Sequence, residues 1–155
     1  MLMVVHASAG ALIGEISQTA LSAFSISFVL HFIMDLVPHG DHEIVARYRE
    51  NKQVKKILSF LITDTLATLC LVVALFVSPI PFNEQLVFWG IAGALLPDII
   101  VALYQVFEFR LLKKFNHFHY FIHDFFPEKK NKKLKFLPGL LLQILVIIFC
   151  LKIIL

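Results

Sequence analysis

Three stretches of the chain consist almost entirely of apolar residues. They cover residues 57–77, 86–107 and 136–155. A helix needs about 20 apolar residues to cross a hydrocarbon core of about 30 Å, so each stretch predicts a membrane-spanning helix. Pro138 suits the first turn of the last one, where its missing N–H is not needed.

The first forty residues predict a shorter pair of helices. Residues 1–14 form an apolar stretch rich in alanine and glycine, and residues 15–18 interrupt it with polar side chains. Residues 19–37 predict a second helix, which ends at Pro38-His39-Gly40. Small residues allow helices in membranes to pack closely, so we expect a tight pair whose first helix is short or re-entrant.

Residues 115–126 alternate aromatic and polar side chains and predict an amphipathic helix at the membrane interface. The expected fold is therefore an all-α integral membrane protein, with four to five membrane-embedded helices and one interfacial helix that carries histidines. Residues 1–155 are expected to form a single transmembrane helical domain, because lipid leaves little else that satisfies the backbone.

Composition agrees with the membrane interpretation. The chain is 59% hydrophobic and 16% charged, and its mean hydropathy is +0.82. Soluble domains are about 45–50% apolar and about 25% charged, which argues against that class. No Lys or Arg precedes Arg47, so no signal peptide is expected. Cys70 and Cys150 stand alone, which gives no disulfide framework.

Basic residues predict the orientation. Lys and Arg gather in residues 47–56 and 110–135, whereas the turn at 78–85 has none. Both basic loops should therefore lie in the cytoplasm. The run Lys129–Lys135 could bind anionic lipid head groups at about 1 kcal/mol per charge, or serve only as a topology signal. Nothing in the pattern favours a nucleic-acid partner, and the oligomeric state is open.

Ionisable side chains inside the apolar stretches indicate a functional site, since each is costly to bury in lipid. At about 1.5 Å per residue, their depths from the cytoplasmic surface can be compared. The depths are about 4 Å for Asp35, 8 Å for His6, 10 Å for His31, 12 Å for Asp64 and 13 Å for Asp98. The five side chains therefore share one layer, and Glu15 falls outside it.

Two pairs with i,i+4 spacing add metal-binding character to this layer. His31 and Asp35 form one pair, and His119 and His123 form the other. Such a pair lies on one helix face and can hold one transition metal. Between the pairs, the chain leaves the membrane at His39-Gly40-Asp41-His42-Glu43, a dense run of potential ligands.

The predicted metal ligands are histidines and aspartates from this layer and the two pairs. They are His6, His31, Asp35, His39, Asp98, His119 and His123, with Asp64 as a weaker candidate. Mixed His/Asp ligation suits zinc foremost, with manganese or iron as alternatives, and the number of candidates allows one or two ions. Each residue taken alone could instead be a hydrogen-bonded packing residue or an interfacial residue. The residues taken together could instead form a proton relay.

Short motifs resemble those of bacterial membrane-bound metal-dependent hydrolases, the YdjM-like inner-membrane family. An early histidine precedes small residues in His6-Ala7-Ser8-Ala9-Gly10-Ala11. Leu36-Val37-Pro38-His39-Gly40-Asp41-His42 is similar to the family's Leu-Leu-Pro-Asp-x-Asp-His segment, with His39 where that motif often has Asp. A later cluster, His117 to Asp124, departs from the His-Arg-Gly-x-x-His form. The resemblance implies an all-helical fold in the bacterial inner membrane and a hydrolase activity.

The expected function is hydrolysis of an ester or phosphoester of a lipid or amphiphile at the cytoplasmic face. Asp41 is the candidate general base, because it lies on the loop where a substrate could arrive. The chain has no Gly-x-Ser-x-Gly or P-loop motif, so a serine nucleophile or nucleotide hydrolysis is not indicated. The alternatives are a small metal-ion or proton transporter that uses the same layer, and a structural protein with a buried polar network.

Overall fold

The computed structural model describes residues 1–40, 54–130 and 135–155. Within these ranges the chain is helical and forms no strand, as predicted for an all-α protein. The elements are α1 (Met3–Ile16), α2 (Ala20–Asp35), α4 (Val54–Val77), α5 (Glu84–Phe107), the short 3-10 turn η1 (Arg110–Leu112), α6 (Lys113–Lys130) and α7 (Phe136–Ile154).

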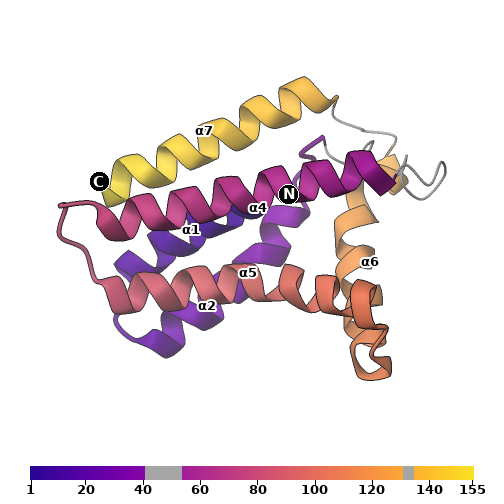
Figure 1. Cartoon of the computed structure of the whole chain (residues 1–155), viewed down its shortest axis with the longest axis horizontal. Helices are drawn as coiled ribbons and strands as arrows, with labels where there is room; N and C mark the ends of the chain where they lie inside the picture. Colours follow the sequence, from indigo (N-terminus) through magenta and orange to yellow (C-terminus); the bar gives the residue numbers. More distant parts are fainter. Residues whose placement is uncertain (41–53, 131–134) are drawn as a thin grey trace.

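Three of these helices, α4, α5 and α7, are long and apolar enough to cross a membrane. The helices α1 and α2 are apolar but shorter. In Figure 1 the three long helices run along the length of the molecule, and α6 lies across the end where α4 begins and α5 ends. The connection between α4 and α5 lies at the opposite end.

The outer surface carries large apolar side chains on every long helix. Leu69 on α4, Val106 on α5 and Leu145 on α7 are all more than half exposed. A soluble monomer rarely exposes so many large apolar groups together, whereas hydrocarbon accommodates them. The apolar outer surface of the bundle therefore supports the membrane interpretation, as the composition of the sequence does.

Helix α1 lies at the centre of the bundle and packs against α2, α4, α5 and α7. Its closest contact is with α5, because both helices present glycine there. A Cβ atom on Gly10 would lie 2.6 Å from the carbonyl oxygen of Gly90, and one on Gly14 would lie 2.5 Å from the carbonyl oxygen of Leu86. Only glycine permits this approach. The small residues of the first helix thus allow close packing as expected, but against α5 more than against α2.

The polar residues between α1 and α2 and at the start of α5 lie at the end of the bundle away from α6 (Figure 1). Thr19 begins α2 with a reciprocal hydrogen-bonded cap to Ser22, and the side chain of Asn83 caps α5. Glu15 accepts a hydrogen bond from the backbone N–H of Asn83 at 2.9 Å. Glu15 therefore bonds the residue that caps α5 and lies outside the predicted layer of ionisable side chains.

Candidate metal centre

Helix α2 places His31 and Asp35 on one buried face. They are one helical turn apart, and Nε2 of His31 lies 3.3 Å from Oδ2 of Asp35. Both residues are almost completely buried, with relative exposures of 1% and 2%. The pair predicted from its i,i+4 spacing therefore points into the bundle, not toward lipid.

Helix α6 brings His119 against this pair. Nε2 of His119 lies 3.1 Å from Nε2 of His31 and 3.5 Å from Oδ2 of Asp35. His119 is also buried, whereas His117 on the same helix is exposed and bonds the carbonyl oxygen of Lys113. The amphipathic pattern of 115–126 thus separates one inward histidine from one outward histidine two residues away.

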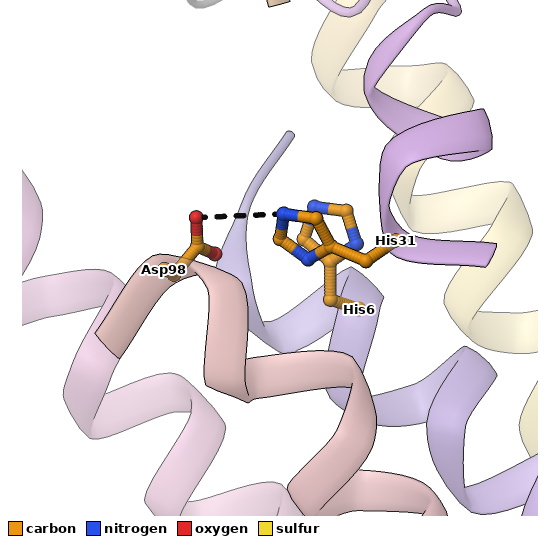
Figure 2. A group of neighbouring side chains, drawn as sticks. All are labelled: His6, His31 and Asp98. Carbon is orange, nitrogen blue, oxygen red and sulfur yellow. Dashed lines mark ion pairs between the residues drawn. The ribbon is translucent and has the colours of Figure 1, made fainter. Parts of the chain in front are cut away.

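Helix α5 supplies the fourth group, Asp98, directly after Pro97. Oδ1 of Asp98 lies 3.4 Å from Nε2 of His119 and 3.7 Å from Nε2 of His31, as Figure 2 shows for the second pair. Asp98 is the most accessible of these side chains, at 22%. We refer to His31, Asp35, Asp98 and His119 as the central four.

The distances from His31 and His119 to each other and to the two carboxylates are close to those between the ligands of one tetrahedral ion. Metal–ligand bonds of about 2.0–2.1 Å in a tetrahedron separate the ligand atoms by roughly 3.3 Å. The Nε2–Nε2 distance between the two imidazoles and the distances from each imidazole to Oδ2 of Asp35 and Oδ1 of Asp98 fall between 3.1 and 3.7 Å. Buried His and Asp side chains here could therefore hold a metal ion, and they come from three separate helices.

Hydrogen bonding orients His31 for such a role. Its Nδ1 lies 2.8 Å from the carbonyl oxygen of Ala94 on α5. A carbonyl oxygen can only accept, so Nδ1 must carry the proton, and in the neutral ring Nε2 then presents a lone pair to the cluster. Metal-binding histidines typically have such a backbone partner on the nitrogen away from the metal.

His6 lies beside the central four. Its ring stacks on that of His31, with centroids 4.0 Å apart and planes 25° apart (Figure 2). Its Nε2 is 3.1 Å from Oδ1 of Asp35. Together with His31 and Asp98 it forms another group whose atoms lie within 4.8 Å of one another. Among the described residues, Nδ1 of His6 and Nδ1 of His119 are buried without a hydrogen-bond partner.

A second histidine pair lies next to Asp35. Nε2 of His39, in the turn after α2, is 3.2 Å from Nε2 of His123 on α6. Asp35, His39 and His123 form a group that could hold an ion, with ligand atoms within 4.8 Å of one another, and all three residues are buried. The structure thus brings together all seven of the main predicted ligands in one connected cluster.

Two residues of α7 support His39, and the sequence analysis did not identify them. Gly139 lies directly against the carbonyl oxygen of His39, where any Cβ would overlap it. Gln143 donates from Nε2 to the same carbonyl at 2.9 Å and accepts from the backbone N–H of Leu2 at 2.8 Å. A buried amide in an apolar helix is itself a signal, because lipid leaves it no solvent partner.

The electrostatics of the cluster favour a cation. Asp35 and Asp98 bring two carboxylates into an interior of imidazoles and apolar side chains, and a buried carboxylate is stable only when paired. The α-amino group of Met1 lies 2.7 Å from Oδ1 of Asp35. A divalent ion among the central four would add positive charge next to both carboxylates.

Asp64 lies outside these three groups and contacts the start of α1. Its two carboxylate oxygens accept from the backbone N–H groups of Met3 at 2.7 Å and Val4 at 3.2 Å. It thereby satisfies two donors that the first turn of a helix leaves unpaired. The prediction that Asp64 is a ligand stays a prediction, and its observed contacts are those of a cap.

Several predicted residues fall outside the described part of the chain. Asp41, His42 and Glu43 lie within 41–53, so the structure does not describe the candidate general base. The same holds for the proposed lipid-binding run, because residues 131–134 and the side chains of Lys129 and Lys130 are outside the described residues.

A cavity of about 330 Å³ adjoins the cluster between α4, α5 and α6. Asp98, His119 and His123 contribute to its wall, so the ligands of the cluster are reached from it. Most of the remaining wall is apolar, and Leu61 and Val106 at its edge are 52% and 71% exposed on the outside of the bundle. The apolar lining includes Phe60, Leu61, Val101, Ala102 and Val106.

The chain was compared with protein families, curated proteins and solved structures. No protein-family model, curated protein or solved structure matches the chain. The fold and the cluster together define an all-α protein with three potential membrane spans and a buried His/Asp site that could hold a metal ion.

Proposed function

We propose that this chain is a membrane-embedded, metal-dependent hydrolase that cleaves an ester or phosphoester of a lipid or amphiphile. The observation that carries the proposal is that Asp98 and His119 belong both to the central four and to the wall of the cavity. An ion held by these residues would therefore face a space of about 330 Å³, within the usual range for small-molecule sites.

A divalent ion in this position would activate water and polarise the scissile group. The residues around it hold the ion, orient its ligands and keep bulk solvent away. Hydrolysis joins the hydroxyl of water to the phosphorus or carbonyl carbon, breaks the bond to the leaving oxygen and returns the second proton to that oxygen. Mixed imidazole and carboxylate ligation favours zinc, with manganese or iron as alternatives.

The cavity favours an amphiphilic substrate. Its wall is polar where Asp98 and His119 lie and apolar toward Leu61 and Val106, whose side chains are exposed on the outer surface. A head group with a scissile ester could thus reach the ion while an attached hydrocarbon chain stays among apolar side chains. A soluble polar substrate would gain nothing from this lining.

The resemblance to the YdjM-like family supports the same activity and a location in the bacterial inner membrane. The cluster lies toward the end of the bundle that α6 crosses, where α4 begins and α5 ends. Residues 47–56 and 110–135, in which Lys and Arg gather, belong to the connections between helices at this end. We therefore infer that this end faces the cytoplasm. A membrane-impermeant thiol reagent on intact cells tests this orientation, after Cys70 and Cys150 are replaced. Lys113→Cys should be protected from the reagent, and Gln85→Cys should be labelled.

The activity is tested on the full chain purified in detergent and loaded with Zn²⁺ or Mn²⁺. Chromogenic phosphoesters and carboxylic esters that carry an alkyl chain are the substrates. Metal-dependent turnover that is lost in Asp98→Asn and His119→Ala and kept in His117→Ala supports the proposal. Metal binding without any hydrolysis, together with metal-ion flux in proteoliposomes, would instead show a transporter.

A further inference from the structure

The cluster extends beyond the central four, and its arrangement repeats. Helix α2 and the turn after it supply His31, Asp35 and His39 at intervals of four residues, and α6 supplies His119 and His123 at the same interval. His31 faces His119 at 3.1 Å, and His39 faces His123 at 3.2 Å, in each case between Nε2 atoms. Asp35 lies between His31 and His39 in the sequence and belongs to a candidate ligand group with each pair.

We propose that His39, His123 and Asp35 form a second metal site, so that the protein binds two ions that share Asp35. This inference rests on the proposed metal ion at the central four. The second site would take the same class of ion, a divalent transition metal that accepts imidazole and carboxylate ligands.

The orientation of His39 supports this site. Its Nδ1 lies 2.6 Å from the carbonyl oxygen of Val37 and must donate to it. In the neutral ring, Nε2 therefore directs a lone pair toward Nε2 of His123, just as Nε2 of His31 faces His119. Two imidazole nitrogens at such a separation are well placed to bind one ion, and in both pairs a backbone carbonyl orients the ring from behind.

The surroundings hold His39 in place. Gly40, directly after it, has a φ of 81°, a conformation that glycine adopts without strain. Gly139 and Gln143 of α7 both contact the carbonyl oxygen of His39. A histidine in a turn is thus held both by its own turn and by α7, which is the support that a metal ligand requires and that a solvent-exposed turn residue does not need.

The sharing of Asp35 is consistent with its position. Oδ2 faces His31 and His119 at 3.3 and 3.5 Å, while Oδ1 lies 3.1 Å from Nε2 of His6 and 2.7 Å from the α-amino group of Met1. A carboxylate has two oxygens and can therefore contribute to two neighbouring ions. Two ions about 3.5–4 Å apart are the arrangement that hydrolases use to stabilise the attacking and leaving oxygens together.

Metal stoichiometry of the full chain tests the second site. The protein is saturated with Zn²⁺ in detergent, separated from free ion and measured by elemental analysis against protein concentration. We expect two ions per chain in the unmodified protein and in His117→Ala, and one ion in His39→Ala and in His123→Ala. One ion in the unmodified protein overturns the inference but leaves a mononuclear hydrolase, whereas no ion overturns both.

A second measurement avoids substitutions that could disturb folding. Two Mn²⁺ ions that share a carboxylate are magnetically coupled, so the electron paramagnetic resonance spectrum of the fully loaded protein should lack the resolved hyperfine pattern of isolated Mn²⁺. That pattern should appear in His123→Ala, which retains a single ion. An isolated-ion spectrum at full loading of the unmodified protein would contradict the second site.

Discussion

Nε2 of His31 and Nε2 of His119 lie 3.1 Å apart, although the two residues are 88 positions apart in the sequence. The proton on Nδ1 of His31 is committed to the Ala94 carbonyl, so the nitrogen that faces His119 presents a lone pair. Two imidazoles that meet in this way inside an apolar bundle are explained well by an ion between them.

Replacing His119 by alanine should abolish metal binding at the central four. The variant removes one ligand and leaves Asp98 without its closest partner in the group, at 3.4 Å. The loss of affinity should exceed the 10–100-fold effect that is typical of residues outside the ligand shell. Isothermal titration with Zn²⁺ measures it, and His117→Ala, an exposed histidine two residues away, is the matched control. Unchanged affinity in His119→Ala would remove this residue from the site.

Replacing Gln143 by leucine should destabilise the protein. The substitution leaves the N–H of Leu2 and the carbonyl of His39 without their side-chain partner, at a cost of about 1–3 kcal/mol for each group. Thermal unfolding in detergent should show a clear decrease in midpoint. Gln143→Glu retains an acceptor for Leu2 but, when ionised, buries a carboxylate against the His39 carbonyl, so its midpoint should also lie below that of the unmodified protein. Equal midpoints for all three proteins would show that these bonds contribute nothing.

Replacing Gly90 by alanine should separate α1 from α5. A Cβ at this position overlaps the carbonyl oxygen of Gly10, and backbone cannot move aside as a flexible side chain can. Overpacking of this kind costs about 1–3 kcal/mol and occasionally more. We expect a lower unfolding midpoint and weaker metal binding, because α1 carries His6. Leu103→Ala, on the exposed side of α5, should have little effect, and the same small effect for Gly90→Ala would contradict the packing described.

Replacing Ala102 by phenylalanine should reduce activity without removing the metal. The larger side chain enters the cavity where Ala102 forms part of the wall, while the central four are unchanged. Hydrolysis of long-chain substrates should fall at least about tenfold, since a misplaced substrate loses most of its orientation, and short-chain analogues should be less affected. Leu103→Phe adds a similar group outside the cavity lining and should behave as the unmodified protein does. An equal loss for short and long chains would contradict a chain-binding role.

The helices and most of the residues that gather in the His/Asp cluster could be predicted from the sequence. Apolar length predicted α4, α5 and α7, and the i,i+4 spacing of His31 with Asp35 and of His119 with His123 predicted two ligand pairs. Spacing along one helix cannot show how two helices dock, so the pairing of His31 with His119 and of His39 with His123 came only from the structure.

The sequence did not predict the contacts of side chains that bond to distant backbone groups. Asp64 lies at nearly the same predicted depth as Asp98, but its carboxylate accepts from the first N–H groups of α1, a contact with no signature in the sequence. Gln143 interrupts an apolar helix, yet its partners lie more than one hundred residues away. Both contacts arise from tertiary packing, which residue type and periodicity do not encode.

The most direct test of the metal centre is the elemental analysis of the purified full chain before and after dialysis against a chelator. The buried His/Asp cluster predicts that zinc, manganese or iron copurifies with the protein, and that its removal lowers the unfolding midpoint until the ion is restored, because ions that bind only the folded state stabilise it. Asp98→Asn and His31→Ala should bind less metal while still inserting in the membrane. A chain that copurifies with no transition metal, takes up none on titration and unfolds at the same temperature with and without chelator would contradict the metal centre.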